Sequence, residues 1–193
     1  MNKKIRKTTE ADFNRIMEIY AYARDFMEKT GNPNQWGPTN WPPADLIHND
    51  IKESNSYVCV NADGTVIATF FFTHGEDIEP TYRRITDGAW LDDRPYGVVH
   101  RLAADGSEKG TGQFCLEWAY RQCGHLRVDT HTDNLVMQKL LGRLGFEKCG
   151  IIYVVEDHYP RYAYEKSDRS ILPCVLTEQI VPVQSSPVRR TVS

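Results

Sequence analysis

The sequence lacks a long apolar run. Its longest one, from Val66 to Phe72, has the length of a strand, whereas a membrane-crossing helix needs roughly 18 apolar residues or more. The first residues, Met-Asn-Lys-Lys-Ile-Arg-Lys, are basic and no apolar stretch follows them, so we expect no secretory signal. These absences predict a cytoplasmic protein without a membrane partner.

Paired cysteine spacings are also missing. The five cysteines form no C-x-x-C motif and their number is odd, which argues against a disulfide framework and against a zinc site. We expect no metal, and thiols that pack as small apolar groups. The cysteines are Cys59, Cys115, Cys123, Cys149 and Cys174.

No strong excess of positive charge is present. The formal net charge is -3, which argues against a broad nucleic-acid-binding surface. Apolar residues make up 40% and charged residues 25% of the chain, as expected for a folded protein. A length of 193 residues suits one domain.

The apolar periodicity predicts an α/β (α+β) domain with a mixed, mostly antiparallel central sheet flanked by helices. The pattern ends near Lys166, so we assign residues 1–166 to the domain and 167–193 to a C-terminal extension, either disordered or irregularly packed. Strands are expected at 3–7, 57–60, 65–72, 96–103, 126–130, 149–155 and 161–166, and helices from Thr9–Asp12 to Gly31, at 44–52, from Gly112 to Gly124 and at 134–144.

One segment carries most of the chemical information, Leu102-Ala-Ala-Asp-Gly-Ser-Glu-Lys-Gly-Thr-Gly-Gln113. It joins a predicted strand to a predicted helix, where unpaired backbone N–H groups and the helix dipole favour an anion. Gly110 and Gly112 allow close approach of a phosphate, and Lys109 adds a full positive charge. An ordinary strand-to-helix turn is the alternative.

Two other phosphate-binding motifs fit this segment less well. A P-loop requires Lys after its second glycine, but Lys109 precedes Gly110. A dinucleotide-binding G-x-G-x-x-G has Cys115 at its third position, although Asp129 stands near the place of the ribose-binding acid. A nicotinamide-dependent oxidoreductase therefore stays an alternative function.

The order of these features resembles the GNAT superfamily of acyl-CoA-dependent N-acyltransferases over residues 4–166. Ser107-Glu-Lys-Gly110-Thr-Gly112 matches the family's [Gln/Arg]-x-x-Gly-x-[Gly/Ala] loop except at its first position. The opening Ile5-Arg6 with Thr9-Glu-Ala-Asp12, and the segment from Asn134 to Leu144-Gly145-Phe146, resemble two further family motifs.

The resemblance implies transfer of an acetyl group from acetyl-CoA to a primary amine of a small molecule or peptide, by direct attack in a ternary complex. It places the backbone N–H of Leu102 at the thioester oxygen and Ala104 near the pantetheine arm. The cofactor-binding residues that it implies are Leu102, Ala104, Ser107, Lys109, Gly110, Thr111, Gly112, Gln113 and Asn134.

His100 is the candidate base because it lies two residues before Leu102, on what we expect to be the same face of the strand. Imidazole exchanges protons near neutral pH. A hydrogen-bonded sheet histidine is the equally weighted alternative, and Glu76 or Asp77 acting through water is another. Many family members carry a tyrosine as the general acid at the position that Leu141 occupies here. Either Tyr153 serves as the acid instead, or the coenzyme A thiolate leaves without protonation.

Aromatic and acidic residues supply a candidate acceptor pocket. Tyr20, Trp36 and Trp90, with Tyr22 and Trp41, can form an apolar or cation-accepting wall. The acids that would favour a cationic amine are Glu76, Asp77, Glu79 and Asp87. Core packing of the aromatics and exposure of the acids are the alternatives. Leu141 also keeps a non-catalytic acyl-CoA-binding module open, and exposed strands leave a homodimer open.

Overall fold

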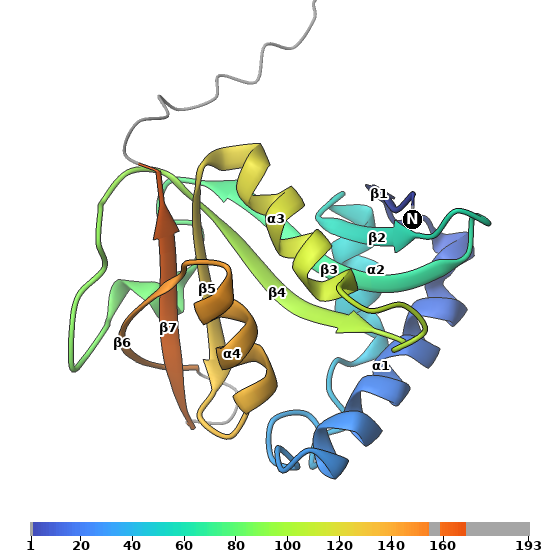
Figure 1. The fold of residues 1–193 in the computed structure, drawn as a ribbon, viewed down its shortest axis with the longest axis horizontal. Helices are drawn as coiled ribbons and strands as arrows, with labels where there is room; N and C mark the ends of the chain where they lie inside the picture. The colour runs from blue at the N-terminus through green and yellow to red at the C-terminus, as the bar shows by residue number, and fades with distance from the viewer. Residues whose placement is uncertain (1, 155–158, 169–193) are drawn as a thin grey trace, which may run out of the picture.

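The described residues, 2–154 and 159–168 of the computed structural model, contain one seven-stranded sheet (Figure 1). Its strand order is β1-β2-β3-β4-β5-β7-β6, and β4 and β5 are the parallel neighbours in an otherwise antiparallel sheet. This confirms the predicted fold class. The elements are β1 (Lys4–Lys7), α1 (Phe13–Lys29), α2 (Ala44–Lys52), β2 (Ser56–Val60), β3 (Val66–Gly75), β4 (Tyr96–Ala104), α3 (Thr111–Cys123), β5 (His125–His131), α4 (Leu135–Arg143), β6 (Glu147–Tyr153) and β7 (Pro160–Ser167).

The beginning of α1 follows from local sequence. The backbone N–H of Thr9 donates to Oδ2 of Asp12 over 2.9 Å, at a short 3-10 turn (Glu10–Asp12) that leads into the helix. Asp12 also accepts hydrogen bonds from Arg6 of β1 at 2.7 and 2.8 Å. The Arg6 hydrogen bond is the main reason why the pKa of Asp12 falls to about 2. One carboxylate therefore joins the first strand to the first helix.

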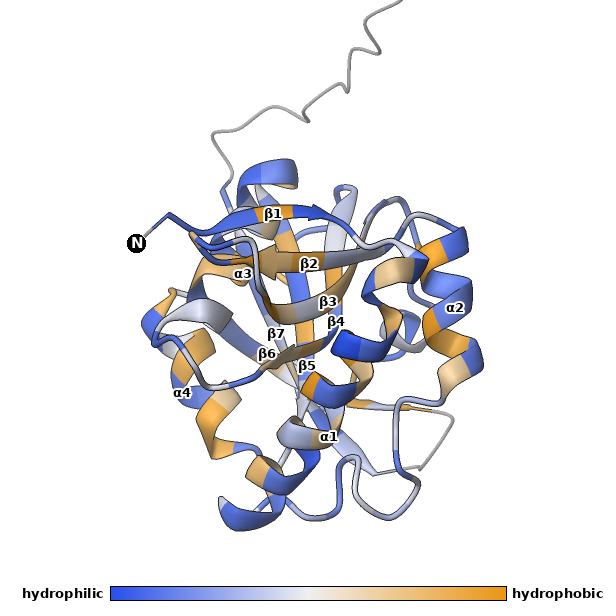
Figure 2. Ribbon diagram, turned by 90° about the vertical axis from the view of Figure 1, so that its right-hand side faces the viewer, coloured by the Kyte–Doolittle hydropathy of each residue, from blue (hydrophilic) through white to orange (hydrophobic). Residues whose placement is uncertain are grey.

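Helices cover both faces of the sheet. Figure 2 shows α1 and α2 on one side of the strands and α3 and α4 on the other. The core under α3 contains Leu116, Ala119 and Leu126, and the core under α1 contains Ile16 and Ile19. All five side chains are buried. The helices α1 and α3 therefore each pack against the sheet through an apolar stripe of their own.

The segment between β3 and β4 departs from the sequence prediction. The strand β3 continues to Gly75, and a 3-10 turn forms at Pro80–Arg83 where we expected no element. Pro80 fits the first turn, and Glu79 caps it by accepting from the Thr81 N–H at 3.1 Å.

No helix in the described ranges is both long enough and apolar enough to cross a bilayer. Cys174 lies outside the described residues.

A buried charged cluster fixes the end of the sheet away from α1. Glu165 of β7 is 0% exposed and pairs with His125 and with Nε of Arg127, which lies 3.1 Å away. Glu165 also accepts from the Leu91 N–H at 2.5 Å, so it ties the loop before β4 to the sheet. Burial by itself would raise the pKa of Glu165, but these partners outweigh it and lower the pKa.

Replacing Glu165 by Gln should lower the free energy of unfolding by about 3 kcal/mol, because Arg127 then keeps a buried charge without its counter-ion. Urea denaturation measures the loss. Asp77→Asn is the control: it breaks the exposed Asp77–Arg83 ion pair and should change stability little. Equal losses in the two variants would contradict the role of Glu165.

Candidate functional site

The strands β4 and β5 separate soon after they meet. Their parallel pairing covers Gly97 with Leu126 and Val98 with Arg127, although β4 continues to Ala104 and β5 to His131. The two strands run apart beyond this point (Figure 1). Backbone groups on the facing edges are therefore available to a ligand instead of to a neighbouring strand.

A β-bulge at Arg101 changes the direction of the β4 side chains. The pairing with β3 passes from Phe71–His100 directly to Thr69–Ala103, and Arg101 has a φ of +55°. Leu102 packs in the core under α3, whereas His100 contacts Phe71 and Glu79 on the opposite face. The expectation that His100 and Leu102 share a face is therefore wrong, because the bulge inserts a residue that strict alternation does not include.

A pocket of about 440 Å³ occupies the gap between the separated strands. Leu116 of α3 and Met137 of α4 line it from one side of the sheet. Trp36 and Trp41, from the loop between α1 and α2, line it from the other side. The pocket thus connects the two faces through the opening in the sheet.

A histidine that is hydrogen-bonded to a carboxylate lies in this pocket. Nε2 of His100 is 2.8 Å from Oε2 of Glu79, and Nδ1 is 3.6 Å from Oδ1 of Asp129. Tyr82 donates its hydroxyl to the same oxygen of Asp129 at 2.8 Å. Burial would raise the pKa of Glu79, but the hydrogen bond and charge of His100, with hydrogen bonds from Thr81, lower it to about 2. The imidazole is therefore oriented by a carboxylate that stays ionised.

The glycine loop leads into the N-terminus of α3, and none of the residues 105–113 lines the pocket. Gly110 is the N-cap residue with a φ of +75°, and a Cβ built there would meet no atom within 4 Å. The first intrahelical bond is donated by Phe114, so the amides before it have no helical partner. Open space next to unpaired donors is the environment expected for a bound phosphate.

The remaining cofactor-loop residues occupy this turn and its neighbourhood. Ser107 donates to Asp105 at 2.6 Å, Thr111 donates to the Glu108 carbonyl, and Gln113 donates to Glu117. Lys109 is exposed and Gly112 faces Leu140. Ala104 packs against the core under α3. Asn134 lines the pocket, where it caps α4 and donates to Gln35 at 3.0 Å.

The structure brings only some of the other candidates to the pocket. Trp36 and Glu79 line it, and Tyr20 is buried directly behind Trp36 with ring centroids 5.9 Å apart. Burial raises the pKa of Tyr20 to about 12. Trp90 does not line the pocket, since it donates to the Tyr82 carbonyl and stacks with Arg127. Glu76 is exposed outside it.

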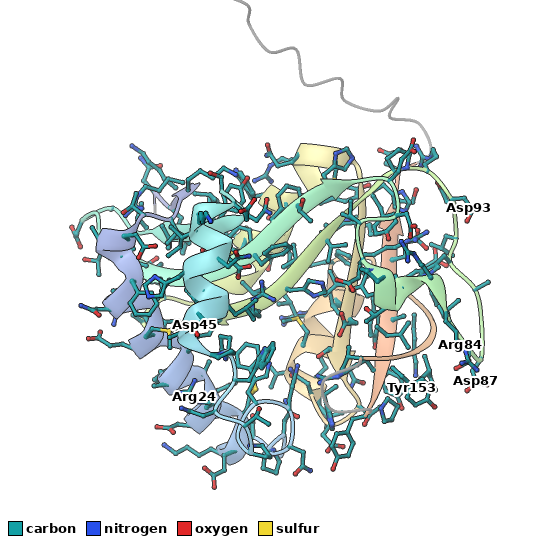
Figure 3. The ribbon with its side chains drawn as sticks, turned by 180° about the vertical axis from the view of Figure 1, so that it is seen from behind. Arg24, Asp45, Arg84, Asp87, Asp93 and Tyr153 are labelled. Carbon is teal, nitrogen blue, oxygen red and sulfur yellow. The ribbon has the colours of Figure 1, made fainter. Side chains whose placement is uncertain are left out.

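Tyr153 is also outside the pocket. It is 53% exposed and lies near Arg84 and Asp87 at the molecular edge, away from Arg24 and Asp45 (Figure 3). The alternation along β6 explains this position, because Ile152 occupies the buried face next to it.

Sequence reasoning did not identify Arg101, Gln35 and Thr130 as pocket residues. Arg101 reaches the pocket because of the bulge, and a bulge of this kind produces no periodic pattern of apolar residues in the sequence. Gln35 reaches it through a loop. Thr130 lies two residues after Val128 in a predicted strand, so a common face for the two was predictable. The opening beside that face was not predictable.

Comparison with known proteins gives a consistent result. No protein-family model and no curated protein matches the sequence significantly. Among solved structures, a GNAT-family acetyltransferase from Streptococcus agalactiae is similar at 28% identity and a TM-score of 0.77, over 86% of this chain and 95% of that chain. This chain belongs to the GNAT superfamily of acetyltransferases. It is accordingly an acyltransferase.

Two more distant GNAT structures share the fold. A protein described as histone acetyltransferase HPA2 and related acetyltransferase, from Corynebacterium glutamicum, is 19% identical with a TM-score of 0.60, over 91% of this chain and all of that chain (100%). A ribosomal-protein-alanine N-acetyltransferase from Brucella melitensis is 18% identical with a TM-score of 0.57, over 86% and 99%.

The low pKa of Glu79 in this GNAT protein predicts a pH dependence of stability. A carboxyl whose pKa falls from 4.5 to about 2 on folding stabilises the protein above about pH 4.5, and this contribution disappears as the pH falls towards 2. Glu79→Gln should therefore be less stable than wild type at pH 6, and the difference should shrink on acidification. Denaturant titrations from pH 6 to pH 2.5 measure it. The exposed Glu76→Gln should show no such trend, and a constant difference for Glu79→Gln would contradict the assignment.

Proposed function

We propose that this chain transfers an acetyl group from acetyl-CoA to a primary amine of a small molecule or peptide, by direct attack in a ternary complex. The observation that carries the proposal is the pocket between β4 and β5. It joins the side of the sheet that holds the glycine turn to the side that holds His100 and Glu79. A donor and an acceptor can therefore meet in the opening.

The residues on the α3 side fit an acyl-CoA. The unpaired amides at the start of α3 and the open space at Gly110 suit the pyrophosphate. Thr130 lines the pocket, is 1% exposed, and its hydroxyl has no hydrogen-bond partner among the described residues. A buried polar atom of this kind needs a partner, and an amide of the pantetheine arm would supply one. When bound, acetyl-CoA provides a thioester with a transferable acetyl group.

The bulge supports an oxyanion site at Leu102. Arg101 and Leu102 are skipped in the register with β3, so their N–H groups are outside that ladder, and both residues line the pocket. A fixed backbone donor stabilises the negative charge that develops on a carbonyl oxygen in acyl transfer.

His100 is the base that we propose. An ammonium must lose a proton before its nitrogen can attack, and imidazole accepts protons near neutral pH. Glu79 orients the ring through the 2.8 Å contact, and Asp129 adds a second negative charge that attracts a cationic amine. No acid is required if the thiolate leaves unprotonated, which is consistent with the position of Tyr153 away from the pocket.

Two alternative functions receive less support. A nicotinamide-dependent oxidoreductase needs a doubly wound parallel sheet for its nucleotide, whereas this sheet is mostly antiparallel. A non-catalytic acyl-CoA-binding module does not need an oriented histidine between two carboxylates, so the His100 cluster favours catalysis. A cytoplasmic location and a homodimer stay predictions.

Gly110→Glu should abolish binding of acetyl-CoA, because a carboxylate would occupy the space next to the unpaired amides. Isothermal titration calorimetry measures the affinity. Gly64→Glu is the matched control: Gly64 also has a positive φ and an open surrounding, but lies in the turn between β2 and β3. The two variants carry the same conformational cost and added charge, so similar affinities would refute the site.

His100→Gln should lower kcat by about 100-fold or more, with little change in the KM for acetyl-CoA, because it removes proton transfer but not cofactor binding. Thiol release with an acceptor found in a panel of amines measures the rate. His48→Gln is the control, since His48 is exposed and contacts Glu10 outside the pocket. A loss of less than threefold in His100→Gln would exclude His100 as the base.

A further inference from the structure

The acceptor side of the pocket carries positive as well as negative charge. Glu79 and Asp129 flank His100 there, and Arg101 lines the same pocket. Arg161 of β7, which is 7% exposed, also lines it. A site that selected amines by negative charge alone would not expose an acceptor to guanidinium groups, since each of them repels an ammonium.

Arg101 is held in a fixed position by its neighbours. Its Nη2 donates to Oδ2 of Asp50 over 2.6 Å, and its guanidinium carbon lies 4.8 Å from the centroid of the Phe71 ring. The side chain of Asp50 is 7% exposed and that of Arg101 is 13% exposed. The bulge at residue 101 directs this side chain to the acceptor side of the sheet.

The donors of Arg101 are not all used by Asp50. A guanidinium has five N–H donors in a planar fork, and its Nε has no hydrogen-bond partner among the described residues although the atom is buried. A buried donor without a partner costs free energy, unless a ligand satisfies it. The matching ligand group is a carboxylate, which accepts two parallel hydrogen bonds from one guanidinium.

We infer that the acceptor is a small zwitterion of the amino-acid class, which carries a carboxylate in addition to its amine. The inference rests on the proposed acetyl transfer and narrows its substrate. The ammonium group is attracted by Glu79 and Asp129 next to His100, and the carboxylate binds the guanidinium of Arg101. Because the side chains of the consecutive residues His100 and Arg101 both contact the Phe71 ring, the two groups of the acceptor are separated by few bonds.

The inference is tested with matched acceptors. The twenty amino acids and β-alanine are compared with their amides, with the corresponding decarboxylated amines and with polyamines, by thiol release from acetyl-CoA. We expect kcat/KM for the best amino carboxylate to exceed that of its amide by about tenfold or more, because a charge-assisted hydrogen bond is lost in the amide. Arg101→Lys keeps a cation for Asp50 but lacks the fork, and should reduce this acid-to-amide ratio by about tenfold.

Matched variants separate recognition from folding. Arg83→Lys is the control, since Arg83 pairs with Asp77 on the surface outside the pocket, and it should keep the wild-type ratio. If Arg101→Lys does not fold, Arg101→Gln combined with Asp50→Asn removes both charges of the pair together and should bring the ratio close to one. An unchanged ratio in the folded Arg101 variant overturns the inference.

The outcomes also distinguish this inference from the proposed function. Turnover of polyamines or amides at or above the level of amino carboxylates overturns the zwitterionic acceptor and leaves amine acetylation standing. Absence of turnover with every amine, despite binding of acetyl-CoA, overturns both.

Discussion

The separation of β4 from β5 is the constraint on which the site depends. A parallel pair that continued along both strands would satisfy the backbone groups of both edges and fill the centre of the sheet. Pairing over only two residues of each strand instead leaves an opening, and the adjacent bulge at Arg101 leaves two β4 residues outside the β3 ladder. The helices α3 and α4 on one face, and the loop before α2 on the other, then enclose the opening as a pocket.

Two histidine–carboxylate clusters, one buried and one partly exposed, show how position decides the use of the same groups. His125, Glu165 and Arg127 are enclosed at the end of the sheet away from α1, where Glu165 holds the loop at Leu91. His100, Glu79 and Asp129 line the pocket. We expect removal of a partner from the first cluster to affect chiefly stability, whereas the second cluster lines a pocket in which a ligand can contact it. Both clusters pair a histidine with carboxylates, and they differ in whether a ligand can reach them.

Much of the fold was predictable because its signals are local. The helix at 44–52 and the glycine-capped end of α3 are observed where sequence placed them, since apolar periodicity and caps act within a few residues. Leu102, Ala104 and the turn at Gly110 were identified from a motif that resembles a known family. The common face of His100 and Leu102 was wrong because a bulge depends on pairing with β3, which lies about 30 residues earlier in the chain. Tyr153 and Trp90 were chosen by residue type, and neither type specifies which face of an element meets the pocket.

The sequence alone determined the order of the elements, the glycine turn at Gly110 and the presence of a histidine on the strand before that turn. These features depend on backbone propensity and on neighbours in the chain. Only the tertiary structure decided that Glu79 orients His100, that Asp129 and Arg101 join them, and that the loop with Trp36 closes over the group. Those contacts join residues from different elements, so they arise when the strands pair and separate, and no spacing within one segment encodes them.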